Sequence, residues 1–311
     1  MSILFSPFFQ KINTIRPEND DFLQRLTTIA LTPKILYYNG VLPKNVVYDE
    51  KKGPERPKTV AIVGTRKNTP YGKEVAYKLT FELAKRGVVI VSGLAFGIDS
   101  VAHKAAVDAG GITVAILGNP IGAIQPREHE ALAKKILDQN GAIISEYPKN
   151  SALDYRRTFL QRNRLISGLA DVVVVVEAAE HSGSLNTAMH ALDQNRDLFA
   201  VPGNITSALS QGCNKLIKQG AMPYTGVDDV MDLLFPPTKK KRSKKSQQAE
   251  LIFGDTKEET TILQAIQAGE SDGEQLMKLA NLSISEFNQI ISILEIKGRV
   301  FPEGLNHWCL K

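Results

Sequence analysis

The sequence has little cysteine and no long apolar run. Cys213 and Cys309 are the two cysteines among 311 residues, with no CxxC pair and no histidine at the spacing of a metal ligand. Neither a disulfide framework nor a structural zinc site is therefore expected. No apolar stretch reaches the ~18 residues of a membrane helix, and no basic segment precedes the apolar residues at the start. We expect a cytoplasmic protein without membrane contact.

Motifs of nucleotide-dependent enzymes are also missing. There is no GxGxxG with an acidic residue after the next strand, so a nicotinamide cofactor is not expected. There is no GxxxxGK[ST], so the lysine of an ATP-hydrolysing P-loop is absent. His103 and His190 have no nucleophile or carboxylate at a suggestive spacing, and no serine lies in a GxSxG elbow. The sequence therefore predicts no metal, no cofactor and no catalytic centre.

The positive charge is concentrated in one short segment. Lysine and arginine exceed aspartate and glutamate by 38 − 33 = +5. Six positive charges lie between positions 239 and 245: Lys239, Lys240, Lys241, Arg242, Lys244 and Lys245. The rest of the chain therefore sums to 5 − 6 = −1. The sequence pI of about 9.0 mainly reflects this segment, and an argument for nucleic-acid binding must rest on local patches.

Between residues 58 and 235, short β-branched runs alternate with amphipathic helical patterns. This alternation indicates parallel βαβ units. Strands are predicted at Val60–Val63, Val88–Val91, Val114–Leu117, Ala142–Ser145, Val172–Val176 and Leu198–Val201. The run of five valines has no polar alternation, as is typical of a central strand covered on both faces. We predict an α/β fold with a doubly wound parallel sheet.

The remaining segments flank this sheet. Residues 1–57 are predicted as a short helical or extended piece, with loops at Gly40–Leu42 and Tyr48–Pro57. Residues 236–254 are predicted as a basic, disordered linker because prolines, charges and polar residues bury little apolar surface. Residues 255–311 are predicted as a winged-helix-like domain, with helices at Glu258–Gln267, Gly273–Ala280 and Ile284–Lys297 and a hairpin at Arg299–Leu310. This last unit has five basic and nine acidic residues, which favours a protein contact or a regulatory role over DNA reading.

Three glycine- or serine-rich turns follow predicted strands of the sheet. They are Gly64-Thr65-Arg66, the stretch Ser92–Asp99, and Ser182-Gly183-Ser184 after Glu177. Because the carboxyl ends of parallel strands meet at one edge, the turns are expected to lie together with free N–H groups exposed. With Arg66 they predict an anion site that suits phosphate. Each glycine alone has a simpler explanation, since turns often need a positive φ.

A cluster of four arginines with two aromatic residues follows at positions 154–164. Its sequence is DYRRTFLQRNR, and interleaved guanidinium groups and rings suit single-stranded nucleic acid. The alternative is that Arg162 and Arg164 pair with carboxylates while Phe159 belongs to the core. Asp99 is interpreted as a residue of a helix N-terminus, favoured by the dipole, rather than as an acid catalyst.

Nine short motifs occur in order along the chain. They are GTR at 64–66, YG at 71–72, SGLAFGIDSVAHKAA at 92–106, ISEYP at 144–148, RNRLISGLA at 162–170, VVVEA at 174–178, SGSLNTA at 182–188, AVPGNI at 200–205 and GCNKLIKQGA at 212–221. The order and content resemble the DNA-processing protein A (Dpr/Smf) family, densely over residues 58–225. The resemblance implies an extended Rossmann fold and a homodimer that binds single-stranded DNA without nuclease activity. It also implies that the protein protects incoming DNA and loads the recombinase RecA in natural transformation.

The resemblance also implies particular contacts with DNA. Arg127 stands where the family has a basic residue, although the surrounding GxGxxxxYP pattern differs here, and Gln161 replaces a usual proline. The expected DNA-binding residues are Arg66, Ser92, Gly93, Phe96, Gly97, Arg127, Arg156, Phe159, Arg162, Asn163, Ser182, Gly183 and Ser184.

Two other functions use a similar sheet. One is a nucleoside-monophosphate phosphoribohydrolase, whose PGGxGTxxE motif aligns with SGSLNTAMH and places His190 at the catalytic glutamate. Loss of that carboxylate removes the partner of an oxocarbenium-like transition state. The other is a nucleotide-sensing module that binds a small phosphate ligand at the same turns.

Overall fold

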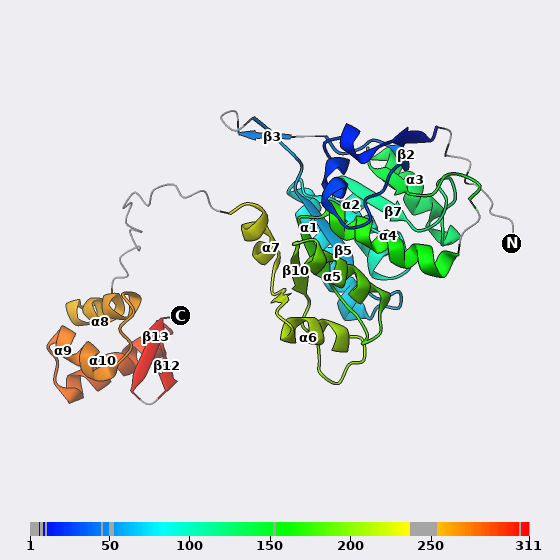
Figure 1. The fold of residues 1–311 in the computed structure, drawn as a ribbon. Coiled ribbons are helices and arrows are strands. Elements are labelled where there is room, and N and C mark those ends of the chain that lie inside the picture. Colours follow the sequence, from blue (N-terminus) through cyan, green and yellow to red (C-terminus); the bar gives the residue numbers. More distant parts are fainter. Residues whose placement is uncertain are drawn as a thin grey trace. The chain divides into compact units, whose positions relative to one another are not determined.

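The computed structural model describes residues 6, 9, 11–44, 46–49, 53–151, 154–236, 254–304 and 306–310. The chain divides into two units, Met1–Pro237 and Thr238–Lys311 (Figure 1). Each is described here by itself. No helix within the described ranges has both the length and the apolar character needed to span a bilayer.

The first unit is built on one large sheet in the order β1-β2-β8-β7-β6-β5-β9-β10-β11. All predicted strands of the sheet are present, with ends within a residue or two of the prediction. They are β5 (Thr59–Val63), β6 (Val89–Ser92), β7 (Thr113–Leu117), β8 (Ala142–Ser145), β9 (Val172–Val175) and β10 (Asp197–Ala200). These strands pair in parallel, and β11 (Met222–Pro223) continues the sheet beyond β10. The order reverses direction at β5, which lies between β6 and β9.

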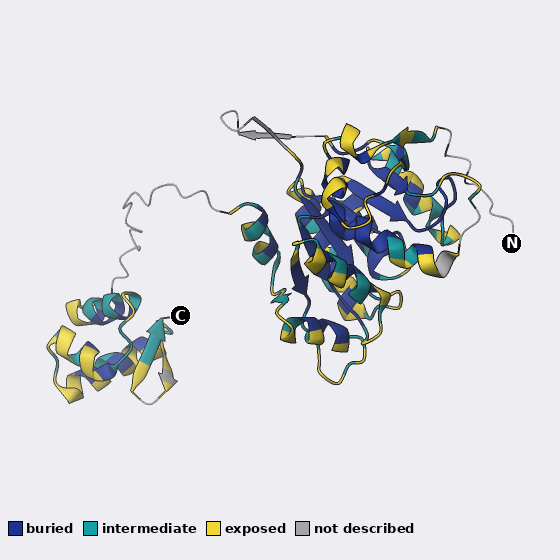
Figure 2. Cartoon of the chain, in the orientation of Figure 1, coloured by how far each residue is buried: buried dark blue, intermediate teal, exposed yellow. Residues whose placement is uncertain are grey.

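Helices cover both faces of this sheet, as the doubly wound prediction requires. One face packs against α1 (Pro70–Lys85), α2 (Ile98–Asp108), α3 (Glu130–Asp138) and α7 (Val227–Leu234). The other packs against α4 (Tyr155–Leu169), α5 (Gly183–Asp193) and α6 (Gln211–Lys218). The strands in the middle of the sheet are buried (Figure 2). The four valines of β9 are fully buried, and successive valines pack on opposite faces of the sheet. Burial on both faces explains why this strand shows no polar alternation.

The N-terminal segment differs from the prediction. Its helical part consists of two 3-10 helices, Pro17–Asn19 and Leu23–Thr28. Strands β1 (Asn13–Ile15) and β2 (Leu36–Gly40) extend the main sheet, because β2 pairs antiparallel with β8. The segment is therefore part of the sheet rather than a separate piece ahead of residue 58.

The loop predicted at Tyr48–Pro57 is also wrong in part. Strands β3 (Val46–Asp49) and β4 (Gly53–Glu55) form a two-stranded antiparallel sheet with an irregular register. Glycine and proline in β4 suggested a turn, but both residues are tolerated in an edge strand that pairs on one side.

The second unit contains the predicted elements in the predicted order. Helices α8 (Lys257–Gln267), α9 (Gly273–Ala280) and α10 (Ile284–Ile296) enclose a small apolar core, and β12 (Val300–Gly304) and β13 (His307–Leu310) form the hairpin. Thr256, Asp272 and Ser283 cap the three helices through their side chains. The winged-helix interpretation agrees with this order and stays a prediction. The basic linker lies outside the described residues.

Candidate nucleic-acid interface

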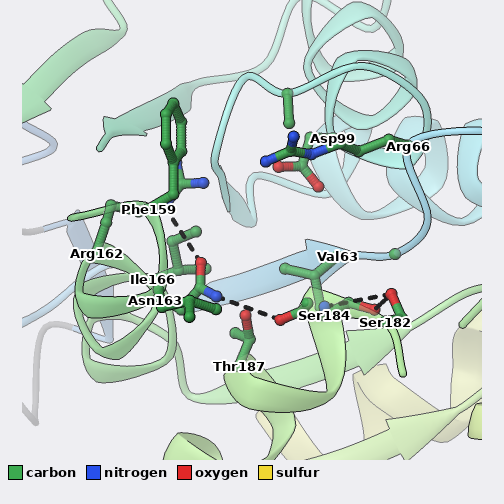
Figure 3. Close-up of a pocket in the computed structure, with 14 residues that line it drawn as sticks. Val63, Arg66, Asp99, Phe159, Arg162, Asn163, Ile166, Ser182, Ser184 and Thr187 are labelled. Carbon is green, nitrogen blue, oxygen red and sulfur yellow. Dashed lines mark hydrogen bonds between the residues drawn. The ribbon is translucent and has the colours of Figure 1, made fainter. Parts of the chain in front are cut away.

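A cavity of about 290 Å³ opens where three loops meet at the carboxyl edge of the sheet (Figure 3). The loops follow β5, β6 and β9, and they lie together because β5 pairs with both of the other strands. Helix α4 closes the remaining side. The lining residues are Val63, Gly64, Arg66, Ala95, Asp99, Phe159, Leu160, Arg162, Asn163, Ile166, Ser182, Gly183, Ser184 and Thr187. The predicted meeting of the three turns is thus observed.

Arg162 lies at the inner wall of the cavity with only 4% of its surface exposed. Its Nη1 donates to the carbonyl oxygens of Gly93, at 2.8 Å, and of Ile116. Burial lowers the pKa of Arg162 to about 10, although the nearby Asp99 acts to raise it. The guanidinium therefore stays positively charged at neutral pH and contributes a fixed charge to the cavity.

Asp99 lies in the first turn of α2, as interpreted from the sequence, and is buried. Its Oδ2 accepts a hydrogen bond of 3.1 Å from the backbone N–H of Gly93. Burial raises the pKa of Asp99, while Arg162 and the backbone N–H groups of Ala95 and Gly93 oppose that rise. The carboxyl group holds the β6–α2 loop against Arg162 and the helix end.

Phe159 lies between two guanidinium groups. The Cζ atoms of Arg66 and Arg162 are 5.6 and 5.8 Å from its ring centroid, within the range of cation–π contacts. The backbone and ring of Phe159 lie against Gly118, where a side chain would clash with the ring. The ring is half-buried, and Arg66 is exposed at the rim of the cavity.

The N-terminus of α5 forms the third wall. Ser182 caps the helix, and its Oγ lies 2.8 Å from the Oγ of Ser184. The amide of Asn163 donates to the Gly183 carbonyl at 3.3 Å, which joins α4 to this wall. The space around Gly183 is open, since nothing lies within 4 Å of the position of a Cβ. The backbone N–H of Ser184 already donates to the Ser182 hydroxyl at 3.4 Å, so the positive end of the helix dipole is what favours an anion here.

Buried groups behind the cavity fix the Arg66 turn. Glu177 accepts hydrogen bonds from the backbone N–H of Thr69, at 2.9 Å, and from its hydroxyl, at 2.5 Å. The Glu177 carbonyl accepts from the N–H of Thr65 at 2.7 Å. Gly97, with a φ of +78°, lies so close to the Thr65 carbonyl that a Cβ would clash there. The turn that carries Arg66 is therefore clamped from two neighbouring loops.

Seven of the predicted site residues line this cavity: Arg66, Phe159, Arg162, Asn163, Ser182, Gly183 and Ser184. Gly93, Phe96, Gly97 and Arg127 do not line it. Gly93 instead makes room for Arg162, and Phe96 and Arg127 are exposed on the outer side of the loops. Arg156 lies in the first turn of α4, but its side chain falls outside the described part of the structure.

One prediction about a side chain needs correction, and one alternative is confirmed for Arg164. Ser92 was expected to donate to a phosphate, but it is fully buried and its hydroxyl donates to the Ile62 carbonyl at 2.6 Å. The hydroxyl of Ser92, at the end of a buried strand, therefore satisfies a backbone carbonyl of the neighbouring strand β5. The alternative considered for Arg164 is correct, because its Nη2 pairs with Glu146 at 2.7 Å and does not reach this cavity.

The sequence analysis missed several lining residues. Thr187, Leu160 and Ile166 lie on α4 and α5 and face the cavity, and Asp99 lines it rather than merely starting a helix. Phe159, Arg162, Asn163 and Ile166 follow one another at helical spacings, because 159 and 162 and also 163 and 166 are three apart, while 159 and 163 and also 162 and 166 are four apart. This spacing places them on one helix face and was visible in the sequence. No group of three or more histidine, cysteine, aspartate or glutamate residues within the described ranges could hold a metal ion.

Comparisons with known proteins agree on one family. The model for DNA recombination-mediator protein A matches residues 13–235. Protein Smf of Escherichia coli is 48% identical over 176 residues, 56% of this chain and 46% of that protein. DNA processing protein DprA of Bacillus subtilis is 38% identical over 225 residues, 72% of each chain. Since the match covers 46% of the Escherichia coli protein and 48% of a Mycobacterium tuberculosis relative, this chain spans about half the length of these relatives.

Two solved structures resemble this chain over most of its length. DNA processing protein A of Streptococcus pneumoniae is 36% identical with a TM-score of 0.61, and the match covers 72% of this chain and 74% of that one. The protein of Helicobacter pylori, described for its mode of binding single-stranded DNA, is 32% identical with a TM-score of 0.58 and coverage of 72% and 95%. These similarities confirm the Rossmann-like α/β fold predicted from the sequence.

Proposed function

Because the chain belongs to the DNA recombination-mediator protein A family, we propose that it binds single-stranded DNA at the carboxyl edge of its sheet. The observation that carries this proposal is the convergence of Arg66, Phe159 and the open N-terminus of α5 on one cavity. A guanidinium group and the N-terminus of a helix suit phosphates, and an accessible ring suits an unstacked base. The name given to the Helicobacter pylori structure supports the same ligand.

The biological role proposed for this binding is protection of incoming DNA and loading of RecA during natural transformation, in the cytoplasm. The names of the relatives support DNA processing, and the RecA contact and the homodimer follow from the family resemblance. We further propose that binding occurs without catalysis. The hydrolase comparison would need a carboxylate at position 190, where this chain has a half-buried histidine outside the cavity.

The test is fluorescence anisotropy with labelled oligothymidylate, a duplex of equal length, AMP and NAD as competing ligands. We expect the single strand to bind more tightly than the duplex at the physiological ionic strength of about 0.15 M. The logarithm of affinity should fall with the logarithm of salt concentration, by about 0.7 for each phosphate neutralised. Equal binding of duplex, or a slope of zero, would contradict the proposal. Displacement of the single strand by AMP at comparable concentration would favour the nucleotide-sensing alternative.

Arg66→Ala identifies the site within the same assay. Arg66 is exposed, so its loss should leave folding unchanged while it weakens binding about tenfold, the effect of one hydrogen bond to a charged group. The matched control is Lys67→Ala, which removes an equally exposed positive charge from the next residue, outside the lining of the cavity. If both variants bind equally well, the first cavity is not the site.

A further inference from the structure

A second cavity, of about 490 Å³, lies on the other side of the loop that follows β6. Ala95 of this loop and Asp99 in the first turn of α2 line the first cavity, whereas Gly97 of the loop and Ser100 of α2 line the second. The loop is therefore a narrow wall between the two cavities. A nucleic-acid strand that leaves the first cavity across this wall enters the second.

The turn after β5 has the same two-sided position. Arg66 lines the first cavity and Asn68 lines the second, two residues further along. The amide of Asn68 donates to the Thr69 carbonyl at 3.0 Å, which orders the turn on that side. Two of the three loops that build the first cavity, those after β5 and β6, thus also border the second cavity.

Three lysines from three different helices line the second cavity. Lys73 comes from α1, Lys104 from α2 and Lys135 from α3, and all three are exposed. None of them forms an ion pair or a side-chain hydrogen bond with another residue that the structure describes. Ammonium groups from separate helices that face one hollow without carboxylate partners suit an anionic ligand.

Two carboxylates also line the cavity, but one of them is engaged. Asp108 accepts a hydrogen bond of 3.0 Å from the hydroxyl of Tyr77, and Glu128 lies at the start of the segment before α3. The three lysines and two carboxylates give the cavity lining a net charge of 3 − 2 = +1. The cavity therefore favours a phosphate over a cation.

An aromatic pair lies at the rim. Phe96, 46% exposed at the crest of the dividing loop, packs edge-on against His129 with ring centroids 5.0 Å apart. His129 lines the second cavity, and its Nδ1 lies 2.8 Å from the Leu94 carbonyl, which holds the imidazole in place. A base that crosses the loop would find an exposed ring fixed by its neighbour.

We propose that the second cavity is a subsite for the same single strand of DNA, in which Lys73, Lys104 and Lys135 bind phosphates of the nucleotides beyond the first cavity. Phe96 contacts the strand as it crosses the loop. The inference rests on the proposed function and adds a path for the strand across α1, α2 and α3. It also gives the exposed Phe96 a role that the first cavity does not provide.

The test compares two triple variants over a series of oligothymidylates of about 4 to 16 nucleotides, the usual range of single-strand site sizes. One variant carries Lys73→Gln, Lys104→Gln and Lys135→Gln. The matched control carries Lys85→Gln, Lys134→Gln and Lys218→Gln, which removes the same charge from exposed helical lysines that line neither cavity. Melting temperatures of both variants should match the parent, because these lysines hold no described partner.

With long oligonucleotides, the first variant should show a salt slope smaller by about 2, from three phosphates at about 0.7 each. With the shortest oligonucleotide that binds, the two variants should be indistinguishable. Equal slopes for both variants at every length would overturn the subsite, as would an equal loss of affinity at short and long lengths. If the parent itself binds no single-stranded DNA, the proposed function fails first and the subsite falls with it.

Discussion

The guanidinium of Arg162 occupies the space that a side chain on Gly93 would need. A Cβ on Gly93 would overlap both terminal nitrogens of Arg162, and Nη1 of the arginine donates to the Gly93 carbonyl at 2.8 Å. The two residues belong to different motifs, 69 positions apart in the chain. The Arg162 guanidinium therefore fits only because position 93 is a glycine. The contact between the two residues joins the loop after β6 to helix α4.

This relationship predicts coupled effects on stability. Arg162→Ala would leave the carbonyls of Gly93 and Ile116 without their donor and Asp99 without its counter-charge. Breaking a buried charged pair in this way costs about 3 to 5 kcal/mol, measured as the free energy of unfolding in urea. Arg157→Ala, on the same helix but exposed, should change it by less than about 0.5 kcal/mol.

Gly93→Ala should also destabilise the parent, because the new methyl group displaces the guanidinium. In the Arg162→Ala background the same substitution should cost much less, since the space is then empty. A double-mutant cycle measures the difference, and contacting residues show coupling energies of about 0.5 to 3 kcal/mol. Strict additivity of the two substitutions would contradict the packing described here.

Phe159 allows stacking to be separated from packing. The ring is half-buried and lies against Gly118. Phe159→Ala would therefore leave a void beside Gly118 and also remove the aromatic ring. Phe159→Leu keeps most of the apolar volume and removes the aromatic face. We expect Phe159→Leu to weaken binding of oligothymidylate by about 1 to 3 kcal/mol, the usual worth of a base on an aromatic ring.

The melting temperature of Phe159→Leu should stay close to that of the parent. A large drop in melting temperature with unchanged affinity would show instead that Phe159 serves the core, the alternative left open by the sequence. The control is Leu192→Ala, which removes an exposed apolar side chain of α5 that lines neither cavity and should leave binding unchanged.

His103 should make the first unit sensitive to mild acid. It is fully buried in α2, and its Nδ1 lies 2.7 Å from the hydroxyl of Thr113, which itself donates to the Ile90 carbonyl. Nδ1 is therefore the donor, and the ring is neutral. Burial, and after it the charges of His129 and Arg162, lower the pKa of His103 to about 3.

The direction of the pH effect follows from proton linkage. Between the ordinary pKa of about 6.5 and the folded value, the unfolded chain binds a proton that the folded chain does not. The stabilising contribution is complete above pH 6.5 and is lost at up to about 1.4 kcal/mol per unit as the pH falls. Asp99, whose pKa burial raises, acts in the opposite direction. The comparison is therefore between the parent and His103→Gln, in urea from about pH 5 to 8, where the variant should show the shallower dependence.

The sequence predicted the sheet well because its signals are local. A run of valines in β9 and glycine-rich turns after strands fix both the fold class and the edge at which the turns meet. The added strands β1 and β2 were not predicted because they join the sheet through the pairing of β2 with β8, which lies more than a hundred residues further along the chain. Such pairings depend on tertiary contacts that no short pattern contains.

The site was predicted at the level of motifs rather than of side-chain roles. Arg66 and Phe159 line the cavity as expected, but Ser92 is committed to the backbone of β5 and Arg162 serves the loop as much as the cavity. Periodicity does not show which polar group of a conspicuous motif is already satisfied by the fold. Whether a polar group is already satisfied depends on neighbours from distant parts of the chain, such as Ile62 for Ser92 and Gly93 for Arg162.

The basic segment Lys239–Lys245, outside the described residues, gives the last prediction. Replacing its six positive charges by glutamine tests whether it contacts DNA or only tethers the second unit. A tether can hold a charged run near the main site at high effective concentration, so weak phosphate contacts would raise affinity at low salt. These phosphate contacts would vanish at high salt, where the Debye length falls to about 3 Å.

We expect the segment to act as a tether alone, because a block of like charges between two folded units is well solvated. The substituted protein should then have the same salt slope as the parent, and a chain that ends after Phe235 should bind equally well. A slope smaller by several times 0.7, with the two proteins converging as salt rises, would make the segment an auxiliary DNA contact instead.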